Sequence, residues 1–320
     1  MRDTILFGDC RETLKEFDEK ARTCVTSPPY YGLRDYGGEE YQIGQEQTPD
    51  EFIEQLVSVF REVRNVLTDD GTLWVNLGDS YYNYRPGKGQ SYPKQTVSKT
   101  KQDLPDKCNK RGNKLDGLKE KDLIGIPWLF AFAMRNDGWY LRQDIIWHKP
   151  NPMPESVRDR CTKSHEYIFL FSKNKKYFYD NEAIKEPAKD WGTRDRTNGK
   201  YHNEGTGLQP HSGLTKSYPT KNKRSVWSVT NKPYRGAHFA TYPPDLIEPC
   251  ILAGSEVGDI VLDPFMGSGT TAAVAKALGR DYIGCELHED YGNLIKKRVE
   301  DYQTVNKVVQ EPSINILDLL

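Results

Sequence analysis

Hydrophobic positions follow two different periods along this chain of 320 residues. Short apolar runs alternate with stretches in which apolar residues recur at every third or fourth position. The first pattern predicts β-strands and the second predicts amphipathic helices. The clearest helix is expected over residues 49–67, whose apolar face is made by Phe52, Leu56, Val59, Phe60, Val63 and Leu67. The alternation of the two patterns predicts an α/β fold, with helices between the strands of a sheet.

The predicted elements leave two long segments without either period. Strands are expected at residues 4–7, 23–26, 72–77, 139–147, 167–171, 258–262 and 280–285, and further helices at residues 11–17, 126–134, 244–253, 270–278 and 290–302. Asp69-Asp70-Gly71 predicts a turn into the third strand. Residues 81–122 and 185–235 predict irregular loops or insertions. The tail from residue 305 is polar and then apolar, and is expected to pack on the body of the protein.

Charge is distributed unevenly along the chain, although the totals nearly cancel. There are 45 Lys and Arg and 46 Asp and Glu, giving a net charge of -1. Residues 81–122 hold 11 basic and 5 acidic residues, and residues 185–235 hold 11 and 4, so the remaining chain has a net charge of -14. Two basic segments on an acidic body are typical of a protein that binds a polyanion such as nucleic acid. Solvated loops without such a function are the alternative.

Several classes of protein are not expected from this sequence. No apolar run approaches the roughly 20 residues that a membrane helix requires. The N-terminal MRDTILFGDC is too short and too acidic for a signal peptide, so we expect a cytoplasmic protein with no membrane partner. The six cysteines form no C-x-x-C pair, which predicts reduced thiols and argues against disulfides or a zinc site. Cys24 and Cys285 lie in apolar runs and are expected in the core.

A strand, a loop with glycines and a helix follow one another in residues 259–271, DIVLDPFMGSGTT. Gly267 and Gly269 allow the backbone to approach a ligand, and the helix after them presents N–H groups to it. Glu286 ends the next predicted strand, at the usual offset for binding ribose hydroxyls. Asp263 would repel a pyrophosphate but suits the sulfonium and ammonium of S-adenosylmethionine, which is the predicted cofactor. A glycine turn that only serves packing is the alternative.

A second motif follows the predicted strand at residues 23–26, at the edge where open α/β sheets place ligands. Ser27-Pro28-Pro29-Tyr30 combines two prolines, which fix the backbone, with an outward hydroxyl and carbonyl and an aromatic ring. Rigid acceptors beside an aromatic face suit a pocket for the amine of an extruded base. For this motif taken alone, a turn without catalytic importance is the alternative.

Together, the two motifs resemble those of the DNA amino-methyltransferases, which methylate the exocyclic nitrogen of cytosine or adenine. Ser27-Pro28-Pro29-Tyr30 precedes DPFMGSG at residues 263–269, an order similar to that of the permuted β class. Further pieces that resemble the family are GDC at 8–10, GTLWVNLGD at 71–79, GWYLRQDIIWHK at 138–149 and HFATYP at 238–243. The resemblance spans most of the chain and leaves out the two basic segments.

The resemblance implies a Rossmann-like, S-adenosylmethionine-dependent methyltransferase fold with a mostly parallel central sheet. The implied divisions are a catalytic half at 1–80, a basic loop or insertion at 81–122, the continuing catalytic domain at 123–184, a target-recognition region at 185–235, a cofactor-binding half at 236–304 and a tail at 305–320. The implied catalytic residues are Ser27, Pro28, Pro29 and Tyr30. The implied cofactor-binding residues are Asp9, Cys10, His238, Tyr242, Asp263, Pro264, Phe265, Gly267, Ser268, Gly269, Thr270 and Glu286, and no metal is expected.

The implied reaction is direct methyl transfer to the amine of a flipped base. Hydrogen bonds from the amine to Ser27 and the Pro28 carbonyl would draw the nitrogen toward tetrahedral geometry, and Tyr30 would stack on the base. No strong general base is needed, because the proton can leave after transfer. Ser at position 27 resembles the cytosine-N4 enzymes, whereas the adenine-N6 enzymes commonly carry Asp or Asn there. We favour cytosine N4 and keep adenine N6 as the alternative.

Double-stranded DNA is the expected partner. Residues 185–235 are expected to read base edges, residues 81–122 to close on DNA, and residues 154–160 either to line the base pocket or to hold a loop. A cognate restriction endonuclease and a second copy of the chain are further partners to consider. Two other classes stay open: a methyltransferase for RNA or a protein amide, and an inactive nucleic-acid-binding module. Ser27 and the basic segments count against the former, and the intact motifs against the latter.

Overall fold

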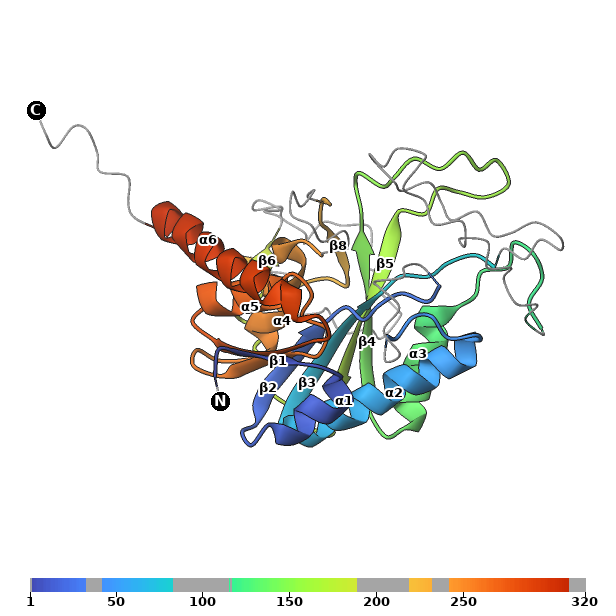
Figure 1. The fold of residues 1–320 in the computed structure, drawn as a ribbon. Helices are drawn as coiled ribbons and strands as arrows, with labels where there is room; N and C mark the ends of the chain where they lie inside the picture. Colours follow the sequence, from blue (N-terminus) through green and yellow to red (C-terminus); the bar gives the residue numbers. More distant parts are fainter. Residues whose placement is uncertain are drawn as a thin grey trace, which may run out of the picture.

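An eight-stranded sheet runs through the centre of the protein (Figure 1). The structure is a computed structural model that describes residues 2–32, 42–82, 115, 117–188, 219–231 and 242–310, with side chains up to residue 303. The strands lie in the order β1-β10-β9-β2-β3-β5-β4-β8. Their bounds are β1 Thr4–Phe7, β2 Ala21–Thr26, β3 Leu67–Leu77, β4 Tyr140–His148, β5 His165–Ser172, β8 Val226–Ser228, β9 Ile260–Asp263 and β10 Asp281–Glu286. β5 runs antiparallel to β3 and β4, and the other neighbouring pairs are parallel, so the predicted mostly parallel sheet is confirmed.

Two groups of helices cover the two faces of the sheet (Figure 1). The first group consists of α1 Cys10–Thr13, the 3-10 helix η1 Leu14–Glu16, α2 Pro49–Val66 and α3 Ile126–Asn136. The second consists of α4 Pro244–Gly254, α5 Thr270–Ala277 and α6 Gly292–Gln310, which follows the 3-10 helix η3 Glu289–Tyr291. Leu73 and Trp74 are neighbours in β3 and enter two different core clusters, because successive residues of a strand point to opposite faces.

Helix α2 is determined by its local sequence. The Thr48 hydroxyl accepts the Glu51 N–H at 3.2 Å, and the Glu51 carboxylate accepts the Thr48 N–H at 3.1 Å, which satisfies donors at the start of the helix. Pro49 follows at a position where a helix needs no N–H. Phe52 and Phe60 are fully buried on the predicted face. The helix predicted over residues 49–67 is confirmed to within one residue.

Some predicted boundaries are wrong, each for a local reason. The helix predicted at 11–17 is the four-residue α1 followed by η1, which ends with Phe17 in an extended conformation. β3 begins at Leu67 instead of after a turn at 69–71, because Ala21 pairs with Leu67 before the register shifts. The tail predicted from residue 305 is helical up to Gln310, where α6 ends. The chain after residue 310 lies outside the described residues.

The described parts of the two basic segments are more regular than predicted. The Tyr82 N–H donates to the Asp122 carbonyl at 2.8 Å, so the two ends of the segment 81–122 lie side by side. β8 joins the main sheet through β4, and β6 Glu186–Pro187 pairs with β7 Thr220–Lys221. The prediction of an irregular chain over 185–235 is therefore wrong for these strands.

The core contains the thiols that were expected there. Cys24 and Cys285 are both fully buried, which confirms their predicted position. In the described ranges, no cluster of His, Cys, Asp and Glu is arranged to hold a metal ion. None of the helices in the same ranges is long and apolar enough to cross a membrane.

Candidate active site at the carboxyl edge of the sheet

The two sequence motifs leave neighbouring strands at the centre of the sheet. β2 pairs with β9, with Cys24 opposite Leu262, and the chain leaves both strands at the same edge. The Thr26 hydroxyl donates to Asp263 Oδ1 at 2.6 Å and joins the two strand ends directly. On the β2 side of this pair the sheet continues with β3, β5, β4 and β8, and on the β9 side it continues with β10 and β1. Such a point, where the strand order reverses, is where open α/β sheets bind ligands.

The glycine loop 264–269 connects β9 to α5 and is shaped by Gly269. This residue precedes the first turn of α5 and has φ of 82°, in the left-handed region that favours glycine. A Cβ at this position would lie 2.8 Å from Ile295 Cγ2, so there is also no room for a side chain. The loop therefore runs close to α6 and turns directly into a helix N-terminus, as predicted for a ligand-binding loop.

Asp263 is buried behind this loop and is fully engaged by protein donors. Its carboxylate accepts from the hydroxyls of Thr26, Tyr242 at 3.1 Å and Thr271 at 2.5 Å, and from the Phe265 N–H at 3.0 Å. Burial raises the pKa of Asp263, and these hydrogen bonds oppose that rise. The carboxylate thus fixes the shape of the loop. Its predicted contact with a cationic cofactor stays a prediction.

Glu286, the last residue of β10, is hydrogen-bonded to the glycine loop 264–269. Its carboxylate accepts the Gly267 N–H at 2.8 Å and the His288 N–H at 3.0 Å. Burial raises the pKa of Glu286, and the two backbone donors counteract this rise. The glycine loop and the acid at the end of β10, which are predicted to share a ligand, therefore meet in the structure.

The surroundings of Glu286 fit an adenosine-bearing cofactor. His288 Nε2 is buried and lacks a hydrogen-bond partner within the described chain, so it can serve a polar group of a ligand. Phe7 lies opposite Glu286 in the β1-β10 ladder, and its side chain is 38% exposed. An unpaired polar atom and an exposed ring beside an acid match the mixed polar and aromatic surface of a nucleoside.

The other predicted cofactor residues of the amino-terminal half lie at the end of β1. The Asp9 carboxylate caps α1 by accepting the Arg11 N–H at 2.9 Å, and it also pairs with the Arg11 guanidinium. Burial would raise the pKa of Asp9, but the hydrogen bonds from Arg11 outweigh it and lower the pKa. Cys10 is buried beside it, and burial raises the pKa of its thiol.

The remaining predicted cofactor residues differ in exposure and in location. Ser268 is buried and its hydroxyl accepts from Arg298, while Thr270 is buried in the first turn of α5. Pro264 is buried and precedes Phe265, whose ring lies edge-on to Phe60 with the centroids 6.5 Å apart. His238 lies outside the described residues.

Tyr242 lies just before α4 and contacts residues of β9 and α5. Its hydroxyl lies within hydrogen-bond distance of both Asp263 and Thr271, and burial raises its pKa well above the ordinary range. Thr271 in turn donates to Asp263, so hydroxyl groups surround the acid. Tyr242 therefore supports the loop 264–269 through its contact with Asp263, and a direct contact of Tyr242 with the cofactor stays a prediction.

The predicted catalytic motif follows β2 without interruption. Pro28 is buried, whereas Ser27, Pro29 and Tyr30 are half-buried at the edge of the sheet. Ser27 Oγ lies 3.5 Å from Asn76 Oδ1 at the end of β3. The Tyr30 hydroxyl donates to Glu166 Oε2 at 2.6 Å, at the start of β5. The motif is thus held by side chains of β3 and β5, the next two strands of the sheet beyond β2.

Sequence reasoning missed the residues that hold this motif. Asn76 lies in a predicted strand, and its position at the edge could have been inferred from the strand's end. Glu166 could not, because only the antiparallel pairing of β5 with β3 brings residue 166 to this edge. Lys149 pairs with Glu166, and its ammonium lies 4.2 Å from the centroid of the Trp147 ring.

Comparison with known proteins identifies the family. A sequence model described as DNA methylase matches residues 21–297, which include both motifs. The chain belongs to the DNA methylase family. The resemblance found in the sequence, to S-adenosylmethionine-dependent DNA amino-methyltransferases, is confirmed by this match.

Sequence relatives extend this finding over nearly the whole chain, and solved structures share its fold. Type II methyltransferase M.SmaI of Serratia marcescens is 47% identical over 301 residues, covering 92% of this chain and 90% of the relative. Type II methyltransferase M.Cfr9I of Citrobacter freundii is 44% identical over 302 residues, covering 94% and 89%. The PvuII DNA methyltransferase (cytosine-N4-specific) has a TM-score of 0.60 at 18% identity and covers 96% of this chain and 92% of that one.

A proposed DNA modification methylase of Thermus thermophilus, solved with S-adenosyl-L-methionine, gives a TM-score of 0.58 at 24% identity over 93% of each chain. The two structural likenesses, to this protein and to the PvuII enzyme, confirm the predicted Rossmann-like methyltransferase fold of the methylase.

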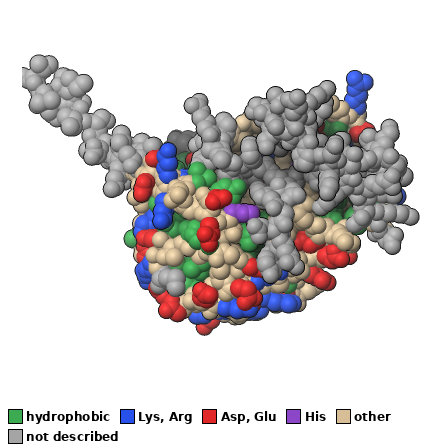
Figure 2. Space-filling model, in the orientation of Figure 1, with side chains coloured by type: hydrophobic (Ala, Val, Ile, Leu, Met, Phe, Trp, Pro, Cys, Tyr) green, Lys and Arg blue, Asp and Glu red, His purple; other side chains and the backbone are tan. Residues whose placement is uncertain are grey.

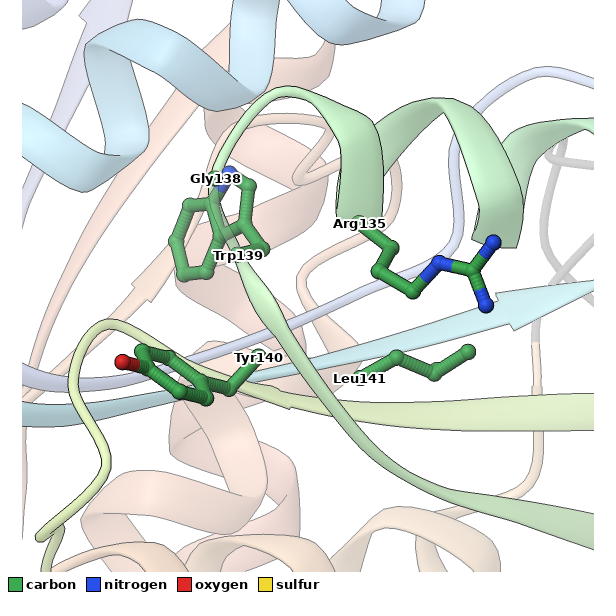
Figure 3. A pocket seen from close by; sticks show the side chains of 5 residues that line it. All are labelled: Arg135, Gly138, Trp139, Tyr140 and Leu141. Atoms are coloured by element: carbon green, nitrogen blue, oxygen red, sulfur yellow. The ribbon is translucent and has the colours of Figure 1, made fainter.

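One hollow of the methylase lies away from these motifs. It has a volume of about 390 Å³ and is lined by Arg135, Gly138, Trp139, Tyr140 and Leu141, where α3 turns into β4 (Figure 3). Tyr140 begins β4 and pairs with Ser172, the last residue of β5, so this hollow lies at the end of the sheet opposite to the two motifs. The candidate active site is therefore placed at the opposite edge by the chemistry and hydrogen bonding of its residues, and not by the size of a hollow.

The predicted DNA-binding charge lies mostly outside the described residues. Basic and acidic side chains are interspersed on the described surface in Figure 2. The described cations of the two basic segments are Lys119, Lys121, Lys185, Lys221, Lys223 and Arg224, and all but Lys223 pair with a carboxylate. Lys223 lies over the Trp227 ring. The role of these segments in DNA binding stays a prediction.

Proposed function

We propose that this methylase transfers a methyl group from S-adenosylmethionine to N4 of cytosine in double-stranded DNA. The observation that carries the proposal is the junction of the two motifs at adjacent strand ends, joined by the Thr26–Asp263 hydrogen bond of 2.6 Å. A ligand held by the glycine loop and a base held by Ser27-Pro28-Pro29-Tyr30 would then meet across two neighbouring strands. Holding two reactants in this way contributes much of the rate of a bimolecular transfer.

The cofactor would be held by residues already grouped around β9 and β10. The Glu286 carboxylate and the unpaired His288 Nε2 supply polar contacts, and Phe7 supplies an apolar surface. S-adenosylmethionine, when bound, supplies an electrophilic methyl group on its sulfonium. The carboxylates of Asp263 and Glu286 favour a ligand with positive charge at this edge.

Ser27 and the Pro28 carbonyl would act on the target amine. That amine is a poor nucleophile, because its lone pair is delocalised into the ring. Hydrogen bonds from the amine to these two acceptors draw the nitrogen toward tetrahedral geometry and stabilise the positive charge that develops on it. Tyr30 would stack on the flipped base.

Asn76 supports this role by orienting the Ser27 hydroxyl. The Asn76 Nδ2 group donates to the Tyr167 carbonyl at 3.1 Å, which turns Oδ1 toward Ser27. A Ser27 hydroxyl that donates to Oδ1 keeps its lone pairs for the N–H of the amine. Asn76 carries no charge and is no base, in agreement with a proton that leaves after methyl transfer.

The choice of cytosine N4 rests on Ser at position 27, and one experiment decides it. Duplex DNA is incubated with the enzyme and labelled S-adenosylmethionine, digested to nucleosides and separated. We expect the label in N4-methylcytosine. Label in N6-methyladenine would overturn the choice of base but keep the reaction class, and label only in RNA or protein would overturn the reaction class as well.

We also propose that the protein is a type II methyltransferase, because its 47% identical relative bears that name. A cognate restriction endonuclease would then share its recognition sequence. Plasmid DNA methylated by this protein should resist one such nuclease and remain sensitive to nucleases of other specificity. Resistance to none would contradict this part of the proposal.

The last proposed partner is a second copy of the chain. Sedimentation of the free protein tests it, with a mass of twice 36.8 kDa as the expected result. A mass of 36.8 kDa at all concentrations would show a monomer.

A further inference from the structure

The ring of Tyr30 is held in place at both its edge and its hydroxyl. At the edge, Gly78 leaves room for it, because a Cβ at position 78 would lie 2.7 Å from Tyr30 Cε2 and 3.3 Å from its Cζ. At the hydroxyl, Glu166 Oε2 accepts at 2.6 Å, and Asn76 Oδ1 lies 3.2 Å away. A tyrosine side chain turns about two bonds, and these two restraints together fix both.

Of the two acceptors, Glu166 accepts the hydrogen bond that the Tyr30 hydroxyl donates. A tyrosine hydroxyl has one hydrogen to donate, and the shorter distance and the negative charge both favour the carboxylate. Asn76 strengthens this arrangement, since its Nδ2 donates to Tyr167 O at 3.1 Å and also lies 3.3 Å from Glu166 Oε2. The Glu166 carboxylate thus accepts hydrogen bonds from Tyr30, which follows β2, and from Asn76 of β3.

Lys149 compensates the charge of this carboxylate. Its ammonium pairs with Glu166 Oε1, the oxygen that Tyr30 does not use. The two side chains are only 16% and 14% exposed, so the pair is shielded from water. Lys149 is itself held over the Trp147 ring. The chain of contacts therefore runs from β4 through Glu166 to the catalytic loop.

We propose that Glu166 is a positioning residue for methyl transfer: through the Tyr30 hydroxyl it sets the plane of the ring on which the target base stacks. The inference rests on the proposed function, because it takes Tyr30 as the stacking surface. It adds a residue to the site that no sequence motif marks, since Glu166 and Tyr30 are 136 positions apart. Glu166 acts through Tyr30 and does not touch the base.

A double-mutant cycle with Tyr30→Phe tests whether Glu166 acts through the hydroxyl. We expect Tyr30→Phe and Glu166→Ala each to lower kcat about tenfold, with the KM for S-adenosylmethionine unchanged, because misplacement of a reacting group costs rate. In the Tyr30→Phe background, Glu166→Ala should add no more than about a twofold loss, since the hydroxyl is already absent. Glu166→Gln should lie between wild type and Glu166→Ala, because an amide oxygen still accepts a hydrogen bond.

Independent effects of the two substitutions would overturn the inference. If the losses of the two single variants multiply in the double variant, Glu166 has a purely structural role and the inference is wrong. Glu19→Gln is the matched control, because Glu19 also pairs with a basic side chain, that of Arg2, but lies on the loop before β2, at the other end of the sheet. It should leave kcat and both KM values unchanged.

A second measurement does not depend on turnover. Selective ¹³C labelling of the tyrosine rings gives a nuclear magnetic resonance signal for Tyr30, assigned by its loss in Tyr30→Phe. We expect Glu166→Ala to move this signal toward the position of a mobile tyrosine, and Glu19→Gln to leave it in place. An unchanged signal would overturn the inference even if the kcat values had agreed. Should the wild type methylate no DNA, the proposed function fails, while this measurement still decides whether Glu166 places the ring.

Discussion

The two sides of the proposed active site, the cofactor side around β9 and β10 and the catalytic side around Ser27-Pro28-Pro29-Tyr30, hold their carboxylates in different ways. On the cofactor side, Asp263 and Glu286 are buried and accept hydrogen bonds only from neutral hydroxyl and N–H groups in the contacts described. On the catalytic side, Glu166 is paired with the ammonium of Lys149 and accepts the hydroxyl of Tyr30. Burial raises the pKa of both cofactor-side acids.

The difference indicates two tasks. The negative charge of a carboxylate with neutral partners is not compensated by a cation of the protein, so it can attract a cationic cofactor. A carboxylate with a cationic partner has its charge compensated and serves as a fixed acceptor, which suits the orientation of a ring. Changes on the two sides should therefore separate cofactor binding from catalysis.

The largest expected effect is on the catalytic side. Ser27→Ala should lower methyl transfer about 100-fold or more, because one of the two acceptors for the target amine is lost. Tyr30→Ala should have a loss of similar size, since it removes the stacking surface. Steady-state kinetics and calorimetric titration with S-adenosylmethionine test this, and the cofactor affinity should change little. A large loss of cofactor affinity in Ser27→Ala would break the separation of the two sides.

The next largest effect is expected for salt. Affinity for duplex DNA should fall at least about tenfold between about 50 and about 200 mM salt, because bound lysines and arginines release counterions from phosphates. Cofactor affinity should change much less. Fluorescence anisotropy with labelled duplexes measures the first and calorimetry the second. A DNA affinity that does not respond to salt would contradict the role given to the two basic segments.

A smaller effect is expected for the glycine loop. Gly269→Ala should lower the free energy of unfolding by about 2 kcal/mol, because φ is positive and the new Cβ would meet Ile295. Gly258→Ala is a matched control, since its φ is 84° and a Cβ would meet nothing within 4 Å, so only the backbone cost of about 1 kcal/mol applies. Urea unfolding measures both. Equal losses in the two variants would show that the loop does not depend on close approach to α6.

The smallest expected effect is on pH dependence. Burial raises the pKa of Asp263 in the folded protein above its ordinary value of 3.8. The contribution of its protonated form to the free energy of unfolding is therefore complete below pH 3.8, and it is lost as the pH rises through the raised pKa. Asp263→Asn does not titrate. The free energy of unfolding of wild type minus that of Asp263→Asn should therefore fall as the pH rises from 3.8 toward the raised pKa of Asp263. Urea unfolding across this range measures it, and a difference that grows with pH would contradict the sign.

Much of the fold was predictable because its signals are local. The helix over residues 49–67 follows from a capping box and an apolar face within one segment, and the loop between β9 and α5 follows from glycines between a strand and a helix. The short strand β8 was not predictable. It has three residues and pairs with a strand about 80 positions earlier, so its own sequence contains too little information.

The same contrast applies to the site, and it separates what the sequence alone determined from what only the tertiary structure decided. The sequence determined the two motifs and their order, because each is a continuous segment whose prolines, glycines and acids act within a few residues of one another. The tertiary structure decided their partners. Tyr30 meets Glu166 only through the antiparallel register of β3 and β5, and Asp263 meets Thr26 only because β9 lies beside β2. Strand order and register depend on packing across the whole sheet, and no local pattern contains them.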